Sequence, residues 1–211
     1  MFEPIDEKEL EKLKGQINKK VTVNQPKNFL EFIRNLPKGT LILSIVLIIL
    51  TLVVNGFALL GYDLYVSSIF FGAYYKTLIN AHFEIYRFLS YGFIHTDFFH
   101  LAMNVFALVN LGNFIERIYG AQKFVLTIIL GIIMGGLFVY IANGNELVVG
   151  ISAGLYAILG VLFVYLYETG LIRQPLIQAQ VWRMVMINVL INFLPQVSMV
   201  GHVGGLIAGL F

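Results

Sequence analysis

The sequence is poor in charge and contains no cysteine. Lys, Arg, Asp and Glu make up 12% of its 211 residues, whereas 58% are hydrophobic; a soluble domain has about 25% charged residues. Without cysteine the chain can form no disulfide, no thiol nucleophile and no thiolate metal site. The net charge of +2 is not gathered into a patch, so nucleic acid is not an expected partner. We interpret the chain as a single-domain integral membrane protein that lies in a lipid bilayer.

The few charges are concentrated at the N-terminus. Residues 1–38 hold eight Lys or Arg and six Asp or Glu. We expect a solvated, charged tail with a short helix over Ile5–Lys19, followed by a membrane domain over residues 39–211; an arm that binds a partner is the alternative. Because the first apolar run starts only near Leu41, no cleavable signal peptide is expected.

Six apolar runs predict six membrane helices, because a span needs about 20 residues. The expected spans are Leu41–Leu60, Phe98–Ile118, Phe124–Ala142, Leu147–Tyr167, Leu176–Leu194 and a last one that starts near Met199. The last run has 13 residues up to Phe211. That is about 20 Å of helix, whereas the bilayer core is about 30 Å thick. We therefore expect either a truncated chain or a helix that ends inside the membrane.

The segment between the first two spans, Gly61–Thr96, mixes aromatic and charged residues. It is too polar to cross the bilayer, and its aromatic rings suit a partly embedded position at the interface. Basic residues precede the first span and lie in the loops after the second and fourth spans. The loops on the opposite side of the membrane contain fewer basic residues. The positive-inside rule then predicts a multi-pass protein of the cell membrane with a cytoplasmic N-terminus and Gly61–Thr96 outside.

Polar residues gather at the start of the second span. His100 and Asn104 are four residues apart and share a helix face, and His95 precedes them. They suit hydrogen-bond donors aimed at one buried point, although such residues also simply join neighbouring helices. A metal site is disfavoured, because the five-residue spacing of the histidines is poor for two ligands and no HExxH motif is present.

A serine in the fourth apolar run is the candidate nucleophile. Ser152 lies between Gly150 and Gly154, with Tyr156 one turn further along the same helix face. A serine that only allows close helix packing is the alternative. The GxSxG elbow of soluble hydrolases requires a strand before the serine, and the helical setting expected here excludes that fold.

A histidine in the last apolar run is the candidate base. His202 is followed by Gly205 and Gly209, which with Gly201 form a stripe of small residues. This stripe predicts close approach to the Gly150/Gly154/Gly160 face of the fourth span. A base must come within about 2.6–3.2 Å of the serine oxygen. Because the acidic residues fall at span ends, we expect a Ser–His dyad without a carboxylate, with Tyr156 stacked on the imidazole.

Together these residues resemble the rhomboid family of intramembrane serine proteases, in its bacterial six-span type. The resemblance runs from about Glu84 to the last residue. The shared motifs are E-x-Y-R at Glu84–Arg87, H-x4-H-x3-N at His95, His100 and Asn104, G-x3-E at Gly112 and Glu116, G-x-S at Gly150 and Ser152 followed by Tyr156 and Gly160, and H-x2-G-x3-G at His202, Gly205 and Gly209.

The resemblance implies an all-α fold, a six-transmembrane-helix bundle with a partly embedded outer loop between helices 1 and 2. It implies a serine endopeptidase that cleaves transmembrane segments of membrane proteins and needs no cofactor and no metal. The implied roles are nucleophile for Ser152, base for His202, oxyanion hole for His100, Asn104 and the Ser152 N–H, and support for His95, Tyr156, Gly150, Glu84 and Arg87.

Two residues depart from the family pattern. Ala153 stands where the family usually has glycine, and the extra methyl is expected to narrow the backbone options beside the nucleophile. Tyr86 replaces the usual tryptophan. The alternative function is a catalytically inactive relative that binds transmembrane clients. A transporter or channel is disfavoured, because no paired charges lie at the middle of a span.

Overall fold

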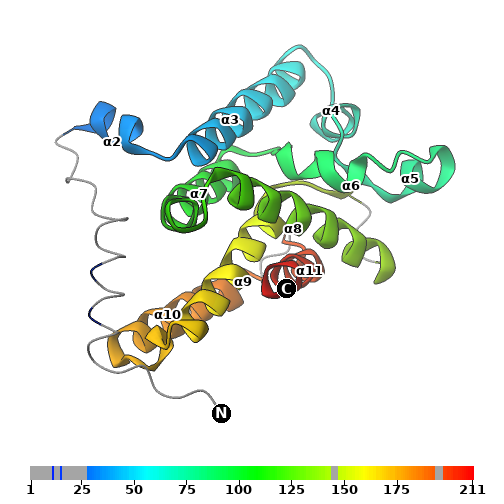
Figure 1. Cartoon of the computed structure of the whole chain (residues 1–211). Helices are drawn as coiled ribbons and strands as arrows, with labels where there is room; N and C mark the ends of the chain where they lie inside the picture. Colours follow the sequence, from blue (N-terminus) through cyan, green and yellow to red (C-terminus); the bar gives the residue numbers. More distant parts are fainter. Residues whose placement is uncertain (1–10, 12–14, 16–27, 144–146, 193–196) are drawn as a thin grey trace.

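The computed structural model describes residues 11, 15, 28–143, 147–192 and 197–211, and it is built almost entirely of helices. Most of the helix expected over Ile5–Lys19 lies outside the described residues. The longer helices, shown in Figure 1, are α3 (Lys38–Leu59), α7 (Phe98–Tyr119), α8 (Ala121–Ile141), α9 (Ser152–Glu168), α10 (Pro175–Ile191) and α11 (Met199–Leu210), and a short α2 (Phe29–Asn35) precedes them.

These helices form the membrane bundle that the apolar runs predict. By length and composition α3, α7 and α8 can each cross a bilayer, and α9 and α11 are shorter apolar helices. The all-α membrane fold is therefore confirmed. The predicted start of the fourth span at Leu147 is wrong. Leu147–Val148 form a short strand, β2, and α9 begins only at Ser152. The nucleophile candidate thus opens a helix instead of lying inside one.

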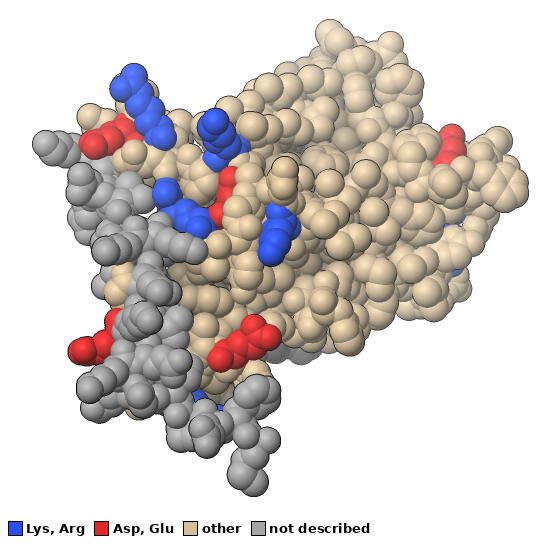
Figure 2. Space-filling model, in the orientation of Figure 1, with Lys and Arg blue, Asp and Glu red and all other residues tan. Residues whose placement is uncertain are grey.

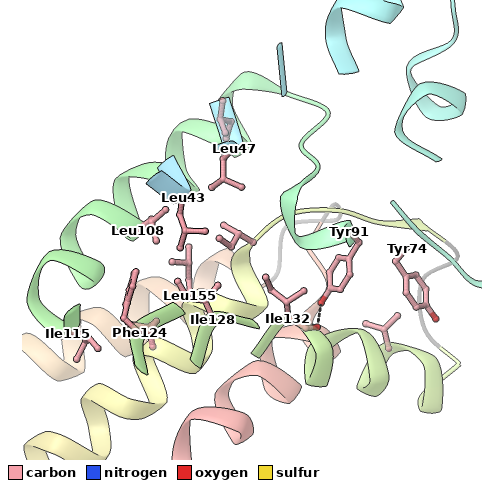
Figure 3. Packing of buried hydrophobic residues seen from close by; sticks show 14 of the residues in the cluster. Leu43, Leu47, Tyr74, Tyr91, Leu108, Ile115, Phe124, Ile128, Ile132 and Leu155 are labelled. Carbon is pink, nitrogen blue, oxygen red and sulfur yellow. Dashed lines mark hydrogen bonds between the residues drawn. The ribbon is translucent and has the colours of Figure 1, made fainter. Parts of the chain in front are cut away.

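The core lies where α3, α7, α8 and α9 meet (Figure 3). Leu47, Leu108, Ile128, Ile132 and Ile158 have no exposed surface. The outward faces of the same helices carry exposed apolar side chains, which a bilayer would cover. Because lipid is as apolar as leucine, packing of this kind depends on close fit more than on exclusion of water.

Two glycines hold α11 directly against the backbone of α9. A Cβ added at Gly205 would lie 2.0 Å from the Ala153 carbonyl oxygen, and one at Gly209 would lie 1.9 Å from the Ala157 carbonyl oxygen. Gly160 faces α11 in return, since its Cβ would lie 2.7 Å from the Leu206 oxygen. Only glycine permits this approach, as the small-residue stripe predicts.

The predicted partners of that stripe are partly wrong. Gly154 faces Ile128 of α8, at 2.9 Å from its added Cβ, and Gly150 faces His100 of α7 at 2.7 Å. On α11, Gly201 has Val139 of α8 at 3.4 Å. The close backbone contact of α9 with α11 is therefore made at Ala153, Ala157 and Gly160.

A compact outer loop connects α3 to α7. It contains α4 (Leu64–Phe70), α5 (Lys76–His82), α6 (Arg87–Ser90), the 3₁₀ turn η1 (Tyr91–Phe93) and a short strand β1 (Tyr74–Tyr75). β1 pairs antiparallel with β2, so that Tyr74 lies opposite Val148. This ladder was not expected in an all-helical chain. It ties the outer loop to the segment that leads into Ser152.

A second bond ties the same two segments. The Gly150 N–H donates to the Tyr91 carbonyl oxygen at 3.0 Å. The Tyr91 hydroxyl in turn donates to the Ile132 carbonyl oxygen of α8 at 2.8 Å, the dashed line in Figure 3. Gly150 has a φ of 108°, a conformation that favours glycine. The chain therefore turns sharply into α9 at a fixed place.

Near the C-terminal end of α7, the buried carboxylate of Glu116 contacts the start of α3. Glu116 accepts hydrogen bonds from the Gly39 and Thr40 N–H groups, both at 2.7 Å, and from the Thr40 hydroxyl at 2.8 Å. The N–H groups of a first helical turn have no partner within the helix, and here another helix supplies it. The G-x3-E motif also brings Gly112 against Thr40, whose Oγ1 would lie 2.6 Å from an added Cβ.

Charge on the visible face is uneven. In Figure 2 most of the visible Lys and Arg side chains gather near α2 and the start of α3 together with acidic ones, and much of the remaining surface is uncharged apart from a few scattered charges. Arg117, near the end of α7, joins this region by hydrogen bonds to Asn113 and to the Asn35 carbonyl oxygen.

Candidate active site

The candidate residues come from separate helices that meet at one end of the bundle. Ser152 is the first residue of α9, His202 lies in the first turn of α11, and His100 lies in the first turn of α7. Asn192 follows the last residue of the oppositely directed α10. The structure therefore brings together side chains that are up to about a hundred positions apart in the sequence.

The serine and the histidine are hydrogen-bonded. His202 Nε2 lies 2.8 Å from Ser152 Oγ, within the distance that proton transfer requires. His202 is only 5% exposed. The contact is made possible by Gly205, three residues beyond the histidine, because its missing side chain brings α11 onto α9. The predicted meeting of the two residues is present.

Tyr156 lies where the helix spacing predicts. Its ring stacks on the imidazole of His202, with centroids 4.1 Å apart and an angle of 17° between the planes. One helical turn separates Tyr156 from Ser152, so the same face of α9 presents both the candidate nucleophile and the ring that stacks on His202.

Asn192 is the residue that sequence reasoning missed. Its Oδ1 lies 2.8 Å from His202 Nδ1, and its Nδ2 donates to the Tyr156 hydroxyl at 2.7 Å. The available signal was an amide within an apolar run, ten residues before the histidine, since a polar residue inside a span points to a functional site. Nothing in the sequence showed which way its side chain turns.

The three polar residues at the start of α7 form a second group. Asn104 Nδ2 lies 2.9 Å from His95 Nε2, and the rings of His95 and His100 have centroids 5.1 Å apart. The Asp97 side chain caps α7 by accepting from the His100 N–H at 2.6 Å. His95 has no exposed surface, which fits a supporting position behind the other two.

Gly150 connects this group to the serine. A Cβ at Gly150 would lie 2.9 Å from His100 Nε2 and 3.5 Å from Asn104 Nδ2. Both side chains therefore approach the backbone two residues before Ser152. The Ser152 N–H belongs to the first turn of α9, where N–H groups lack partners within the helix and favour a negative charge. The side chains of His100 and Asn104 thus lie against Gly150, two residues before the first turn of α9.

Ala153 fits the structure without backbone strain. It lies in regular helix, and its φ is not positive. Its methyl group packs toward α8 at Gly135, where an added Cβ would lie 2.5 Å from it. Gly135 of α8 thus leaves room for the methyl group of Ala153. The smaller range of backbone conformations open to alanine therefore does not disturb the helical conformation seen at this position.

Glu84 and Arg87 stabilise the outer loop. Arg87 is 3% exposed. It donates to Glu84 Oε2 at 2.5 Å and to the Ile69 and Ala73 carbonyl oxygens at 2.8 and 2.7 Å. The hydrogen bond from Arg87 holds the pKa of the Glu84 carboxyl below its ordinary value, although burial opposes this. Tyr86 donates to the same carboxylate at 3.0 Å.

The structure is a helical membrane bundle in which a serine and a histidine, near the ends of two packed helices, are hydrogen-bonded. This combination places the chain in the class of helical membrane proteins with a polar site between their helices. A family model described as the Rhomboid domain matches residues 82–211. This match covers more than half of the chain, and the chain belongs to the rhomboid family.

The relatives include proteins named as proteases and one named as inactive. The chain is 30% identical over 142 residues to rhomboid protease GluP of Bacillus subtilis (strain 168), covering 67% of this chain and 28% of the relative. It is 31% identical over 145 residues to rhomboid-like protease 1 of Toxoplasma gondii, covering 66% and 49%. It is 28% identical over 139 residues to inactive RHOMBOID-like protein 8 of Arabidopsis thaliana, covering 65% and 39%. The chain thus spans less than half the length of each.

Proposed function

We propose that this protein is an intramembrane serine endopeptidase that cleaves transmembrane segments of other membrane proteins. The observation that carries the proposal is the 2.8 Å contact between Ser152 Oγ and His202 Nε2. A serine hydroxyl is a weak nucleophile until a base accepts its proton. The contact supplies that base in the correct position, among helices that can lie in a bilayer.

In the proposed first step, Ser152 Oγ attacks the carbonyl carbon of a peptide bond in an unwound part of the substrate helix. The hydroxyl proton passes to His202 Nε2, and the negative charge develops on the carbonyl oxygen. His100, Asn104 and the Ser152 N–H are the donors that would hold this charge. One such donor is worth about 10²–10³ in rate.

In the second half the intermediate collapses. The C–N bond breaks, the His202 proton passes to the leaving amine, and the acyl group stays on Ser152. A water molecule then gives its proton to His202 and attacks the acyl carbon, which releases the new carboxyl group and restores the serine. Every proton in the cycle moves through one ring nitrogen.

We further propose a cell-membrane location with the N-terminus in the cytoplasm and the site near the outer surface. The gathering of basic side chains near α2 and the start of α3 supports this orientation (Figure 2). Ser152 and His202 lie in the first turns of α9 and α11, at the end of the bundle where the outer loop pairs with β2, so the site would face the outside.

The test is labelling with a fluorophosphonate, together with cleavage of a panel of type I membrane segments in liposomes. We expect Ser152→Ala and His202→Ala each to lower both activities by at least about 10³-fold. Ser44→Ala is the matched serine control, because Ser44 is a buried serine of α3 that donates to the Thr40 carbonyl oxygen. His82→Ala, at the end of α5, is the matched histidine control.

The second candidate is an inactive protein that binds transmembrane clients, which the similarity to inactive RHOMBOID-like protein 8 favours. Folded wild-type protein that captures such segments in liposomes, yet neither reacts with the fluorophosphonate nor cleaves any of them, would support this candidate and overturn the protease. Cleavage that survives either Ser152→Ala or His202→Ala would overturn the assigned pair.

A further inference from the structure

An amide contacts the side of His202 that faces away from the serine. His202 Nε2 meets Ser152, and the opposite ring nitrogen, Nδ1, meets Asn192 Oδ1 at 2.8 Å. In serine hydrolases with a triad, a carboxylate holds that second nitrogen. Among the described residues no carboxylate hydrogen-bonds to His202, and the amide occupies its place.

The hydrogen bonds of Asn192 determine which way its amide points. One group of the amide lies 2.8 Å from the Asn188 carbonyl oxygen, and a carbonyl oxygen can only accept. That group is therefore the NH₂, and its second proton goes to the Tyr156 hydroxyl at 2.7 Å. The remaining group, which faces His202, is the amide oxygen.

The direction of the amide determines the protonation of the histidine. An amide oxygen only accepts, so its partner, His202 Nδ1, carries the hydrogen of the neutral ring. Nε2 is then left with its lone pair, and it is the atom that faces the Ser152 hydroxyl. The Asn188 carbonyl oxygen of α10 and the Tyr156 hydroxyl of α9 thus orient the amide, and the amide selects the tautomer in which His202 is a base toward Ser152.

Asn192 also links the two supports of the ring. Tyr156 stacks on the face of the imidazole, and Asn192 holds its edge and the Tyr156 hydroxyl at once. The ring is therefore fixed in tilt by one residue and in rotation by the other. A neutral amide does this without placing a charge in the membrane, where a carboxylate would be costly.

We propose that Asn192 is a positioning residue that completes a Ser152–His202–Asn192 relay. It sets the tautomer of the base and accepts a hydrogen bond from the Nδ1–H when the ring becomes positive. The proposal rests on the protease function proposed above, and it assigns to α10 a part in the chemistry that the serine–histidine pair alone does not require.

The test compares Asn192→Ala with Asn188→Ala in the full chain. Asn188 is the matched control, because it lies one turn earlier on α10, and its own amide donates to the Met184 carbonyl oxygen. Removing the Asn188 side chain leaves the backbone oxygen that orients Asn192. We expect Asn192→Ala to lower kcat and the rate of fluorophosphonate labelling by about 10²-fold with little change in KM, and Asn188→Ala to leave both unchanged.

A conservative variant separates positioning from packing. Asn192→Asp keeps an acceptor oxygen against Nδ1, and Tyr156 can turn its hydroxyl to donate, but the second carboxylate oxygen loses the bond to the Asn188 carbonyl oxygen and is repelled by it. We expect it to recover part of the labelling rate relative to Asn192→Ala. Since an opposite charge favours the imidazolium, the acid limb of its kcat/KM profile should move to higher pH. All rates are expressed per mole of folded protein. Thermal unfolding and gel filtration measure how much of each variant is folded.

Three results would overturn the proposal: equal rates for Asn192→Ala and Asn188→Ala, a loss that resides in KM, or an Asn192→Asp profile that matches wild type in shape. Each of these leaves an active wild-type protein and so leaves the proposed function standing. Wild-type protein that neither labels nor cleaves would instead overturn the protease function and this proposal with it.

Discussion

Glu116 lies near the end of α7 and the Ser152–His202 pair lies near its start, and these two polar sites differ in how many hydrogen bonds their end groups make. At one end Glu116 receives three donors from the first turn of α3. At the other end a chain of single bonds runs from Asn192 through His202 to Ser152. Within the described residues, Ser152 Oγ hydrogen-bonds to the His202 ring alone.

The difference teaches how to separate structural from chemical polar groups in a membrane bundle. Both oxygens of the Glu116 carboxylate accept hydrogen bonds, and together they use three of about four acceptor sites, so this group stabilises the fold. The relay ends at the Ser152 oxygen, which among the described residues hydrogen-bonds only to His202. A polar group that is bonded to several neighbours holds helices together, whereas one at the end of a chain of bonds is available to a substrate.

The largest expected effect is that substitutions at the two sites change different quantities: one lowers stability and the other lowers activity. Glu116→Ala leaves three donors without partners, so we expect it to lower the free energy of unfolding by about 3 kcal/mol, with activity per folded molecule retained. Ser152→Ala should abolish activity and change stability by less than about 0.5 kcal/mol. Thermal or denaturant unfolding in detergent and fluorophosphonate labelling measure the two quantities.

The opposite pattern would contradict the comparison. Loss of activity per folded molecule in Glu116→Ala would mean that the two ends of α7 are coupled. Glu116→Gln is the matched control, because it keeps the shape and one acceptor oxygen.

A smaller effect is expected from the glycine contact that brings the relay together. Gly205→Ala places a methyl group where the Ala153 oxygen now lies, so α11 must move away from α9. We expect a loss of about 10²-fold in labelling rate and about 1–3 kcal/mol in stability. Gly201→Ala is the control on the same helix, because its nearest neighbours, at 3.2 Å and beyond, are side chains that can shift. Equal losses in both variants would show that the fit between α9 and α11 is not specific.

The smallest effect concerns the outer loop, where the Glu84–Arg87 pair is partly exposed. Because the pKa of Glu84 lies below its ordinary value, its bond to Arg87 stabilises the fold fully above the unfolded pKa of about 4.3, and this contribution is lost as pH falls through the folded value. We expect stability between about pH 5 and pH 3 to fall slightly more in wild type than in Glu84→Gln. Melting curves at several pH values measure this, and identical slopes would argue against it.

The sequence predicted the parts of the site that depend on spacing along one helix. Tyr156 lies one turn from Ser152, His100 lies one turn from Asn104, and small residues on α11 imply a close neighbour. These relations follow from helix geometry alone. The positions of most helices followed in the same way from the length of the apolar runs.

What could not be predicted depends on how helices rotate against each other. Asn192 and His202 meet only because α10 ends beside the start of α11, and Gly154 turned out to face α8 because of the rotation of α9. The β1–β2 ladder was equally hidden, since two residues in each strand leave no alternating pattern to recognise.

The ladder and the Gly150–Tyr91 bond have a mechanical consequence. The strand pairing and that bond fasten the outer loop to Leu147, Val148 and Gly150, which lead into α9. A displacement of the outer loop would therefore move the start of α9, and Ser152 with it. The position of Ser152 is thereby coupled to the position of the outer loop.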